Sequence, residues 1–231
     1  MDLSKWEQEA EEHIRQFCRQ HCELLGQKKG RPITFDYRYE HTRVVAAVAA
    51  ELAAVAGVDP VLARIAAWLH DVARCWDPSL SQQQNQARFD NHGVAGAKEA
   101  AAFLVAVNFP QQLIPQVEQA IANHVGYVKD HQLESPLDAL LWDADKLSKI
   151  NGAGLMHFLG VHLVYEDQLL DMKEYLAADD HMLEKICDSL NMEYARRWGK
   201  KELANTRQIR QQLLRAMAGQ LPALTKTPSE E

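Results

Sequence analysis

Six polar side chains occupy positions where the surrounding sequence predicts a buried, core-facing side chain. They are four histidines and two aspartates: His41, His70, Asp71, His92, His124 and Asp145. Burying a lone carboxylate or imidazole costs several kcal/mol unless a partner compensates. Imidazole nitrogens and carboxylate oxygens together suit a first-row divalent metal. The set therefore indicates a metal site. The alternative is that each side chain is an ordinary hydrogen-bonded core or capping residue.

The adjacent pair His70-Asp71 stands at the end of an apolar, alanine-rich run, residues 61–69, which predicts a buried helix. Neighbouring side chains on a helix point about 100° apart. At the end of a helix, however, both side chains can reach one ion, or the carboxylate can bridge two ions. We therefore place this pair at the centre of the predicted site.

The motifs that carry these residues resemble those of the HD-domain metal-dependent phosphohydrolases. The matching segments, in the order of the family, are Tyr39-Glu40-His41-Thr42-Arg43-Val44, Leu69-His70-Asp71-Val72-Ala73-Arg74 and Asp143-Ala144-Asp145-Lys146-Leu147. The resemblance covers about residues 35–165 and implies a metal held by His41, His70, Asp71 and Asp145. Asp145 is preferred to Asp143 because the ligand in the family directly precedes the basic residue and the leucine.

Two further segments refine the resemblance. The stretches 91–97, with His92, and 120–126, with His124, are similar to motifs of HD branches that hold a second metal or a phosphate-binding histidine pair. One such branch is the bacterial diadenosine tetraphosphate hydrolases, and Arg74 stands where that branch has a lysine. The segments 145–155 and 199–204 resemble instead the small bacterial HD proteins with nucleotide pyrophosphatase activity.

The resemblance implies hydrolysis of a nucleotide, or of a similar phosphate ester or anhydride, by metal-activated water. The implied catalytic residues are Asp71, His92, His124, Arg74 and Lys146. The cofactor would be one or two divalent ions (Mn, Fe, Co, Ni or Mg), with His92 and His124 binding a second ion or the phosphoryl oxygens. Arg74 and Lys146 are candidate phosphate contacts, and their alternative is that both are solvated charges at helix ends.

Three other functions stay open at this point. One is cleavage of a dinucleoside polyphosphate or of a phosphodiester. The second is a non-catalytic domain that binds nucleotide or metal and regulates a partner. The third is a purely structural helical bundle, which does not explain why costly polar groups cluster in its core.

Composition narrows the class of protein. The 231 residues carry a net charge of -7, which argues against a nucleic-acid surface. No segment approaches the roughly 20 apolar residues of a membrane span, and the N-terminus has no apolar signal region, so we expect a cytoplasmic protein. Cys18 and Cys22, with His13 and His21 nearby, could form a zinc site, although free cysteines are commoner in such a helix.

Helical periodicity runs through nearly every segment, which predicts an all-α fold, an HD-domain helical bundle with additional C-terminal helices. We expect a single domain over residues 1–231, with a metal-binding core at about 35–165, C-terminal helices at 166–220 and a frayed tail at 221–231. The C-terminal helices would either wall the pocket or form the face of a homodimer. The predicted helices are 3–27, 40–56, 60–71, 93–107, 113–124, 136–147, 152–165, 167–177, 180–198 and 202–219. The glutamine-rich stretch 77–92 is expected to be a surface loop or lid.

Overall fold

The fold is built from helices alone in the residues that the structure, a computed structural model, describes (2–165 and 170–220), and this confirms the predicted all-α class. Within these residues there are two short 3₁₀ helices, Val72–Arg74 and Gln111–Leu113, and no strand. The α-helices are α1 (Ser4–Lys29), α2 (Tyr37–Ala56), α3 (Pro60–Leu69), α4 (Gln82–Asp90), α5 (His92–Ala106), α6 (Ile114–Asn123), α7 (Pro136–Ile150), α8 (Gly152–Tyr165), α9 (Met172–Ala177), α10 (His181–Ser189) and α11 (Glu193–Met217).

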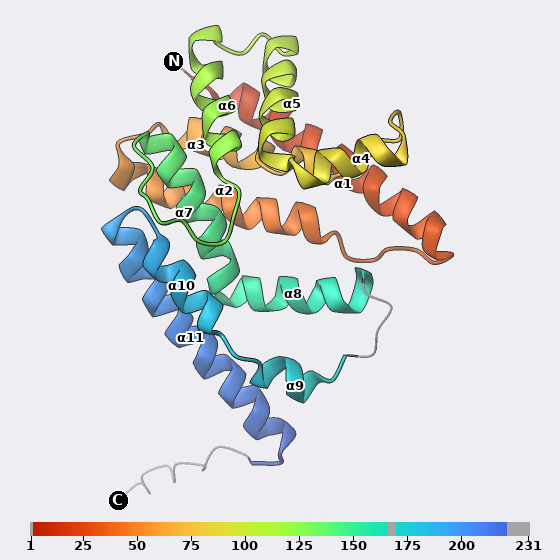
Figure 1. Cartoon of the computed structure of the whole chain (residues 1–231), viewed down its shortest axis with the longest axis vertical. Helices are drawn as coiled ribbons and strands as arrows, with labels where there is room; N and C mark the ends of the chain where they lie inside the picture. Colours follow the sequence, from red (N-terminus) through yellow and green to blue (C-terminus); the bar gives the residue numbers. More distant parts are fainter. Residues whose placement is uncertain (1, 166–169, 221–231) are drawn as a thin grey trace, which may run out of the picture.

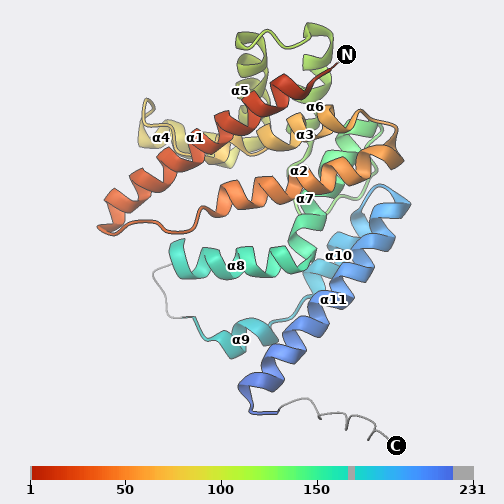
Figure 2. The ribbon, with the colours of Figure 1, turned by 180° about the vertical axis from the view of Figure 1, so that it is seen from behind.

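Helix α3 lies at the centre of the bundle, packed against α1, α2, α6 and α7. In Figures 1 and 2, α5 and α6 project from one end of the bundle, while α9 and α11 extend beyond the opposite end. Helices α10 and α11 pack on α7, and α8 contacts α2, α7 and α11. Among the described residues, no helix is both long enough and apolar enough to cross a membrane.

Three of the helices that position the six polar residues, α2, α3 and α7, begin at strong capping signals, whereas α5 and α6 have no side-chain cap. Asp36 caps α2, Asp59 caps α3 with Pro60 in its first turn, and Ser135 caps α7 with Pro136 in the same role. A side-chain oxygen at the cap satisfies backbone N–H groups that have no partner within the helix. The Asp36 cap starts α2 at Tyr37, three residues before the predicted start.

The prediction of a surface loop over residues 77–92 is wrong for 82–90, which form α4. Ser81 and Gln84 make a reciprocal capping box at its start. The side chain of Asn85 is fully buried and donates to the carbonyls of Asp77, Leu80 and Ser81. Arg88 pairs with Glu99 on α5 at 2.6 Å. Asn85 and Arg88 therefore hold this helix against the bundle through buried hydrogen bonds, while its glutamines are exposed.

Two predicted helix boundaries are also wrong. Helix α1 continues past its predicted end at residue 27 to Lys29 and is capped by Gly30, which adopts the left-handed conformation at φ 65°. Near the C-terminus the chain breaks at 190–192 and not at 199–201. Gly199 lies inside α11, where an added Cβ would come within 3.0 Å of the Leu190 side chain. This glycine thus permits close packing of α11, and its φ is not one that ends a helix.

Two other predictions concern segments near the C-terminus that the structure describes in part or not at all. The predicted helix 167–177 is described from residue 170 onward, and 172–177 of it is the helix α9. The predicted frayed tail, 221–231, lies outside the described residues.

Candidate metal centre

The central pair sits where α3 ends. His70 follows the last residue of α3 and is fully buried, and Asp71 leaves helical geometry at φ -108° and ψ 19°. This change of backbone direction lets both side chains face the same space. The Asp71 side chain is 21% exposed, and its Oδ2 atom lies 3.6 Å from His70 Nε2.

Four imidazole rings form a continuous row around Asp71. The ring centroids of His41 and His70 are 5.4 Å apart, those of His70 and His124 are 5.0 Å apart, and those of His124 and His92 are 5.4 Å apart. Asp71 Oδ2 lies 3.9 Å from His41 Nε2, and Asp71 Oδ1 lies 3.4 Å from His124 Nε2. The carboxylate therefore stands between two groups of potential ligands, His41 with His70 and His92 with His124.

Three of these imidazoles have their Nδ1 hydrogen-bonded to a backbone carbonyl three residues earlier in the chain. His70 Nδ1 lies 2.6 Å from the carbonyl oxygen of Ala67, and His92 Nδ1 lies 3.1 Å from that of Phe89. His124 Nδ1 lies 2.6 Å from the carbonyl oxygen of Ile121. A carbonyl can only accept, so these Nδ1 atoms donate, and the neutral ring presents the lone pair of Nε2.

His41 is fixed in the same way by a hydroxyl. Ser148 Oγ donates to the carbonyl oxygen of Asp145 at 2.7 Å and lies 3.3 Å from His41 Nδ1. Because the hydroxyl hydrogen is committed to the carbonyl, Ser148 accepts from His41 Nδ1. Such fixed Nδ1–H partners are the usual second layer of a metal site, since they orient the ring and set its tautomer.

The donor set fits a divalent cation. Imidazole lone pairs and carboxylate oxygens are all acceptors, so they repel one another unless a cation or a proton lies between them. His70 Nε2 is buried without a hydrogen-bond partner, and His41 Nε2 faces Asp145 Oδ1 at 3.2 Å. A bound ion would satisfy both of these atoms.

A glycine brings the second group of ligands together. An added Cβ at Gly93 would lie 2.5 Å from a methyl carbon of Val125 and 2.9 Å from the carbonyl oxygen of Ala122. The start of α5 can therefore approach the end of α6 only with glycine at this position. The close approach places His92, one residue before Gly93, beside His124.

The two aspartates of α7 have different partners. Asp143 accepts from the backbone N–H groups of Asn191 and Met192 at 2.7 and 2.9 Å, so its carboxylate anchors the start of α11. Asp145 faces His41 and forms ion pairs with Lys146 and Lys149. The structure thus places Asp145, and not Asp143, beside the histidines.

A pocket of about 240 Å³ opens over this cluster. Seven of the eight residues predicted for the site line it, while His70 lies behind its wall: the seven are His41, Asp71, Arg74, His92, His124, Asp145 and Lys146. Arg74 is exposed at the rim. Lys146 is almost fully buried, and its ammonium group also donates to the carbonyl oxygen of His124 at 3.0 Å.

Burial sets the protonation of the site. It lowers the pKa of His41, His70 and His92, which keeps these imidazoles neutral and able to bind a cation. Burial also lowers the pKa of Lys146 to about 8, although the adjacent Asp145 opposes this effect. For Asp145, burial would raise the pKa, but the nearby ammonium groups outweigh it and hold the pKa well below its ordinary value.

Four further side chains belong to this region although no sequence motif predicts them. Lys149 lies four residues after Asp145, a spacing that favours an ion pair on one helix face and could have identified it. Ser148 shows its role only through the fold. Tyr37 stacks near His41, with ring centroids 5.9 Å apart, and His157 lies edge-on to the same histidine at 6.4 Å.

The cysteines lie apart from this site. Cys18 and Cys75 are buried with their Sγ atoms 3.5 Å apart, and none of the four cysteines, all within the described residues, forms a disulfide. His21 Nδ1 accepts from the backbone N–H of Trp76. Among the residues that the structure describes, the side chains close enough to hold an ion are only those around Asp71, so the zinc alternative has no support.

Comparisons with known proteins agree with this architecture. A family model described as HD domain matches residues 38–150, the segment from α2 to α7 that carries all six polar residues. A search of curated proteins finds no match. Among solved structures, a predicted HD-superfamily hydrolase from an uncultured Thermotogales bacterium shares 18% identity, with 94% of this chain and 99% of that chain covered and a TM-score of 0.58.

Two further solved structures are similar. An HD-superfamily hydrolase from Bacillus thuringiensis shares 20% identity, with 91% of this chain and 100% of that chain covered and a TM-score of 0.53. Bacillus subtilis YpgQ, solved in complex with ADP, shares 19% identity, with 79% of this chain and 91% of that chain covered and a TM-score of 0.55. These neighbours share the fold, and the family model covers the helices that build the site. The chain is an HD-domain protein, with its HD domain over residues 38–150.

Proposed function

We propose that the protein is a divalent-metal-dependent phosphohydrolase that acts on a nucleotide. The observation that carries this proposal is the convergence of four imidazoles and two carboxylates on one pocket that also holds two lysines and an arginine. Imidazole and carboxylate ligands suit a hydrolytic metal, while guanidinium and ammonium groups bind phosphate oxygens. The ADP bound by YpgQ supports a nucleotide as the ligand class.

Asp71 lies between the two groups of potential ligands, His41 with His70 and His92 with His124, and we expect both groups to depend on it. We propose that His41, His70, Asp71 and Asp145 hold one ion. The second group, His92 and His124 with Asp71, would hold a second ion or donate to the phosphoryl oxygens. A divalent ion in this site supplies Lewis acidity and lowers the pKa of a coordinated water. Asp71, partly exposed to the pocket, can then position that water and accept its proton.

The cationic residues stabilise the charge of the substrate. An ion on Asp145 would compete with the ammonium groups of Lys146 and Lys149, which now pair with this carboxylate. A phosphate oxygen is the partner that either lysine would then meet in the pocket. Arg74 at the rim can bind a second phosphate group through two parallel hydrogen bonds.

A panel of nucleotides tests this function. Wild-type protein is incubated with each divalent metal and with nucleoside mono-, di- and triphosphates, dinucleoside polyphosphates and cyclic phosphodiesters, and products are identified by chromatography. We expect metal-dependent release of phosphate or pyrophosphate from a nucleotide. His124→Ala should remove most of this activity, whereas His131→Ala, which changes a histidine with a 65% exposed side chain, should keep it.

Two outcomes of the panel would count against the proposal. Hydrolysis that persists fully in a chelator would exclude a metal-dependent reaction. Nucleotide binding without turnover under every metal would instead favour a regulatory domain.

The His124→Ala protein also distinguishes two roles for this side chain. Loss of turnover with full metal content would assign His124 to the substrate, and equal loss of turnover and metal would assign it to a second ion.

A further inference from the structure

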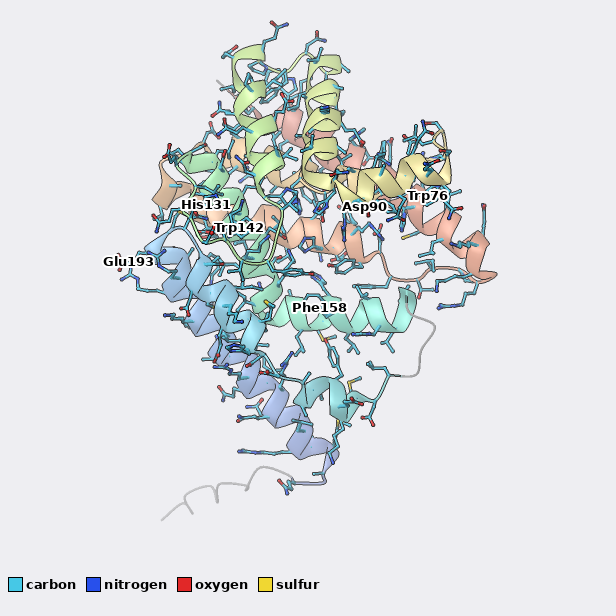
Figure 3. All side chains as sticks on the ribbon, viewed as in Figure 1. Trp76, Asp90, His131, Trp142, Phe158 and Glu193 are labelled. Carbon is cyan, nitrogen blue, oxygen red and sulfur yellow. The ribbon has the colours of Figure 1, made fainter. Side chains whose placement is uncertain are left out.

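A second cavity, of about 190 Å³, adjoins the candidate metal pocket. The two cavities share Lys149 and Phe158 in their walls. Figure 3 shows Phe158 on α8, the helix that lies between α2 and α9 in that view. The other walls of the second cavity come mainly from α10, α11 and the residues before α10, and they include Leu155, Asp179, Met182, Leu183, Thr206 and Arg210. The C-terminal helices therefore supply most of this cavity.

The lining of the second cavity is apolar with a few hydrogen-bonding groups. Leu155, Phe158, Met182 and Leu183 give it an apolar surface. Thr206 donates its hydroxyl hydrogen to the carbonyl oxygen of Ile150 at 2.9 Å. Its oxygen can still accept a hydrogen bond from a ligand. An aromatic ring beside aliphatic side chains is the surface on which a flat, partly polar ring binds well.

The charged side chains on the walls of this cavity balance, since Lys149 and Arg210 are cationic and Asp179 and Asp180 are anionic, so there is no excess of positive charge for a phosphate group. Asp180 is held by Arg207 through two hydrogen bonds of 2.7 and 2.8 Å, and Arg207 also pairs with Glu184. Asp179 is exposed, and its carboxylate accepts from the N–H of His181 and adds a negative charge at the rim. An anion would meet that carboxylate, whereas a hydroxyl or amino group of a ligand could donate to it.

Arg210 offers an unused donor on the same wall. Its Nη1 donates to the carbonyl oxygen of Ala178 at 3.3 Å, while its Nε is buried without a hydrogen-bond partner in the structure. A buried donor that lacks a partner is costly unless a ligand or water satisfies it. A ring nitrogen or carbonyl oxygen of a ligand is an acceptor of suitable chemistry.

We propose that this cavity binds the nucleoside part of the substrate, while the phosphates lie in the metal pocket and pass Lys149 between the two. This assignment rests on the proposed nucleotide hydrolysis and extends it to the role of α10 and α11. A volume of about 190 Å³ is below the 300–1,000 Å³ of pockets for whole drug-sized ligands, so it suits one end of a ligand that continues into the metal pocket.

Filling the cavity tests the proposal. Leu183→Trp places a large side chain on its wall, and Met182→Trp does the same from a residue that is 52% exposed and tolerates change better. Met217→Trp is the matched control, since Met217 is 53% exposed and lies on α11 outside every wall of this cavity. Circular dichroism and thermal melting verify that each variant is folded.

The readout is the dissociation constant of a nucleoside diphosphate and of inorganic pyrophosphate, measured by calorimetry on the metal-loaded protein. We expect Leu183→Trp or Met182→Trp to weaken nucleoside diphosphate binding at least tenfold and pyrophosphate binding less than twofold. Tenfold corresponds to about 1.4 kcal/mol, within the range that one stacked base contributes. The Met217→Trp control should match wild type for both ligands.

Three results would overturn the assignment. The first is equal weakening of both ligands, which indicates a general disturbance of the site. The second is unchanged nucleoside diphosphate binding in both folded variants. The third is a wild-type protein that binds pyrophosphate as tightly as the nucleoside diphosphate. In each case wild-type hydrolysis of nucleotides in the panel would still uphold the proposed function, and its absence would refute that function separately.

Discussion

Replacing Ser148 by alanine should weaken metal binding although this side chain is not itself a ligand. Its hydroxyl is fully buried and is the acceptor that holds His41 Nδ1–H, at 3.3 Å. Without it, the imidazole can rotate or change tautomer, and Nε2 no longer presents its lone pair to the ion. Loss of such a partner typically costs about tenfold to a hundredfold in metal affinity.

The same substitution should lower stability only modestly. The buried Nδ1–H of His41 loses its acceptor, which costs about 1–3 kcal/mol. The Asp145 carbonyl also loses the 2.7 Å hydroxyl donor. Alanine recovers a few tenths of a kcal/mol through its higher helix propensity. We therefore expect a loss of about 1–3 kcal/mol in the free energy of unfolding, which leaves a protein of ordinary stability folded at 25 °C.

A matched control separates the two effects. Ser189 on α10 donates to the carbonyl oxygen of Ile186 at 3.0 Å, the same helical hydroxyl bond but without a histidine beyond it. Metal titration by calorimetry should give a dissociation constant for Ser189→Ala equal to that of wild type and a weaker one for Ser148→Ala. Equal affinities in all three proteins would refute the role of the hydroxyl in orienting His41.

Two other predictions concern stability. Burial lowers the pKa of His21 to about 3. Below pH 6.5 the unfolded chain therefore binds a proton that the folded protein does not bind. Stability falls for this reason as the pH decreases from 6.5 toward 3. His21→Asn keeps an acceptor for the Trp76 N–H. When the pH is lowered from 7 to 5, the free energy of unfolding of this variant should fall by about 2 kcal/mol less than that of wild type, as measured by denaturant titration. Parallel pH profiles of the two proteins would contradict this. Asp143→Ala leaves two backbone N–H groups at the start of α11 without their acceptor and should cost about 3 kcal/mol. A loss below about 0.5 kcal/mol in the same assay would show that Asp143 does not anchor α11.

The six polar residues could be identified from the sequence because imidazole and carboxylate side chains are unusual at positions that the helical period assigns to the core. His70-Asp71 at the end of an alanine-rich helix is such a contradiction, and the helical period alone predicts that His41 faces the core. The order of the matching motifs then joined residues that lie more than 100 positions apart. The all-α class followed from the same periodicity.

Other features depend on contacts that have no local signal. Ser148 looks like an ordinary serine in a helix, and only the packing of α2 on α7 makes it the partner of His41. The segment 82–90 resembles a loop by its polar composition, but Asn85 bonds the preceding turn at Asp77 and Leu80, and Arg88 bonds Glu99 on α5, which buries both side chains. The break before α11 arises from Asp143, nearly 50 residues earlier in the chain.

The central claim is that one carboxylate, Asp71, organises a metal site with the surrounding histidines. Its most direct test is elemental analysis of protein purified without chelator, for wild type, Asp71→Asn and the control Asp130→Asn, whose side chain is 99% exposed. Both substitutions remove one carboxylate with almost no change in size. We expect bound divalent metal in wild type and in Asp130→Asn, and little or none in Asp71→Asn at unchanged helical content. Wild-type metal content in a folded Asp71→Asn protein would contradict it.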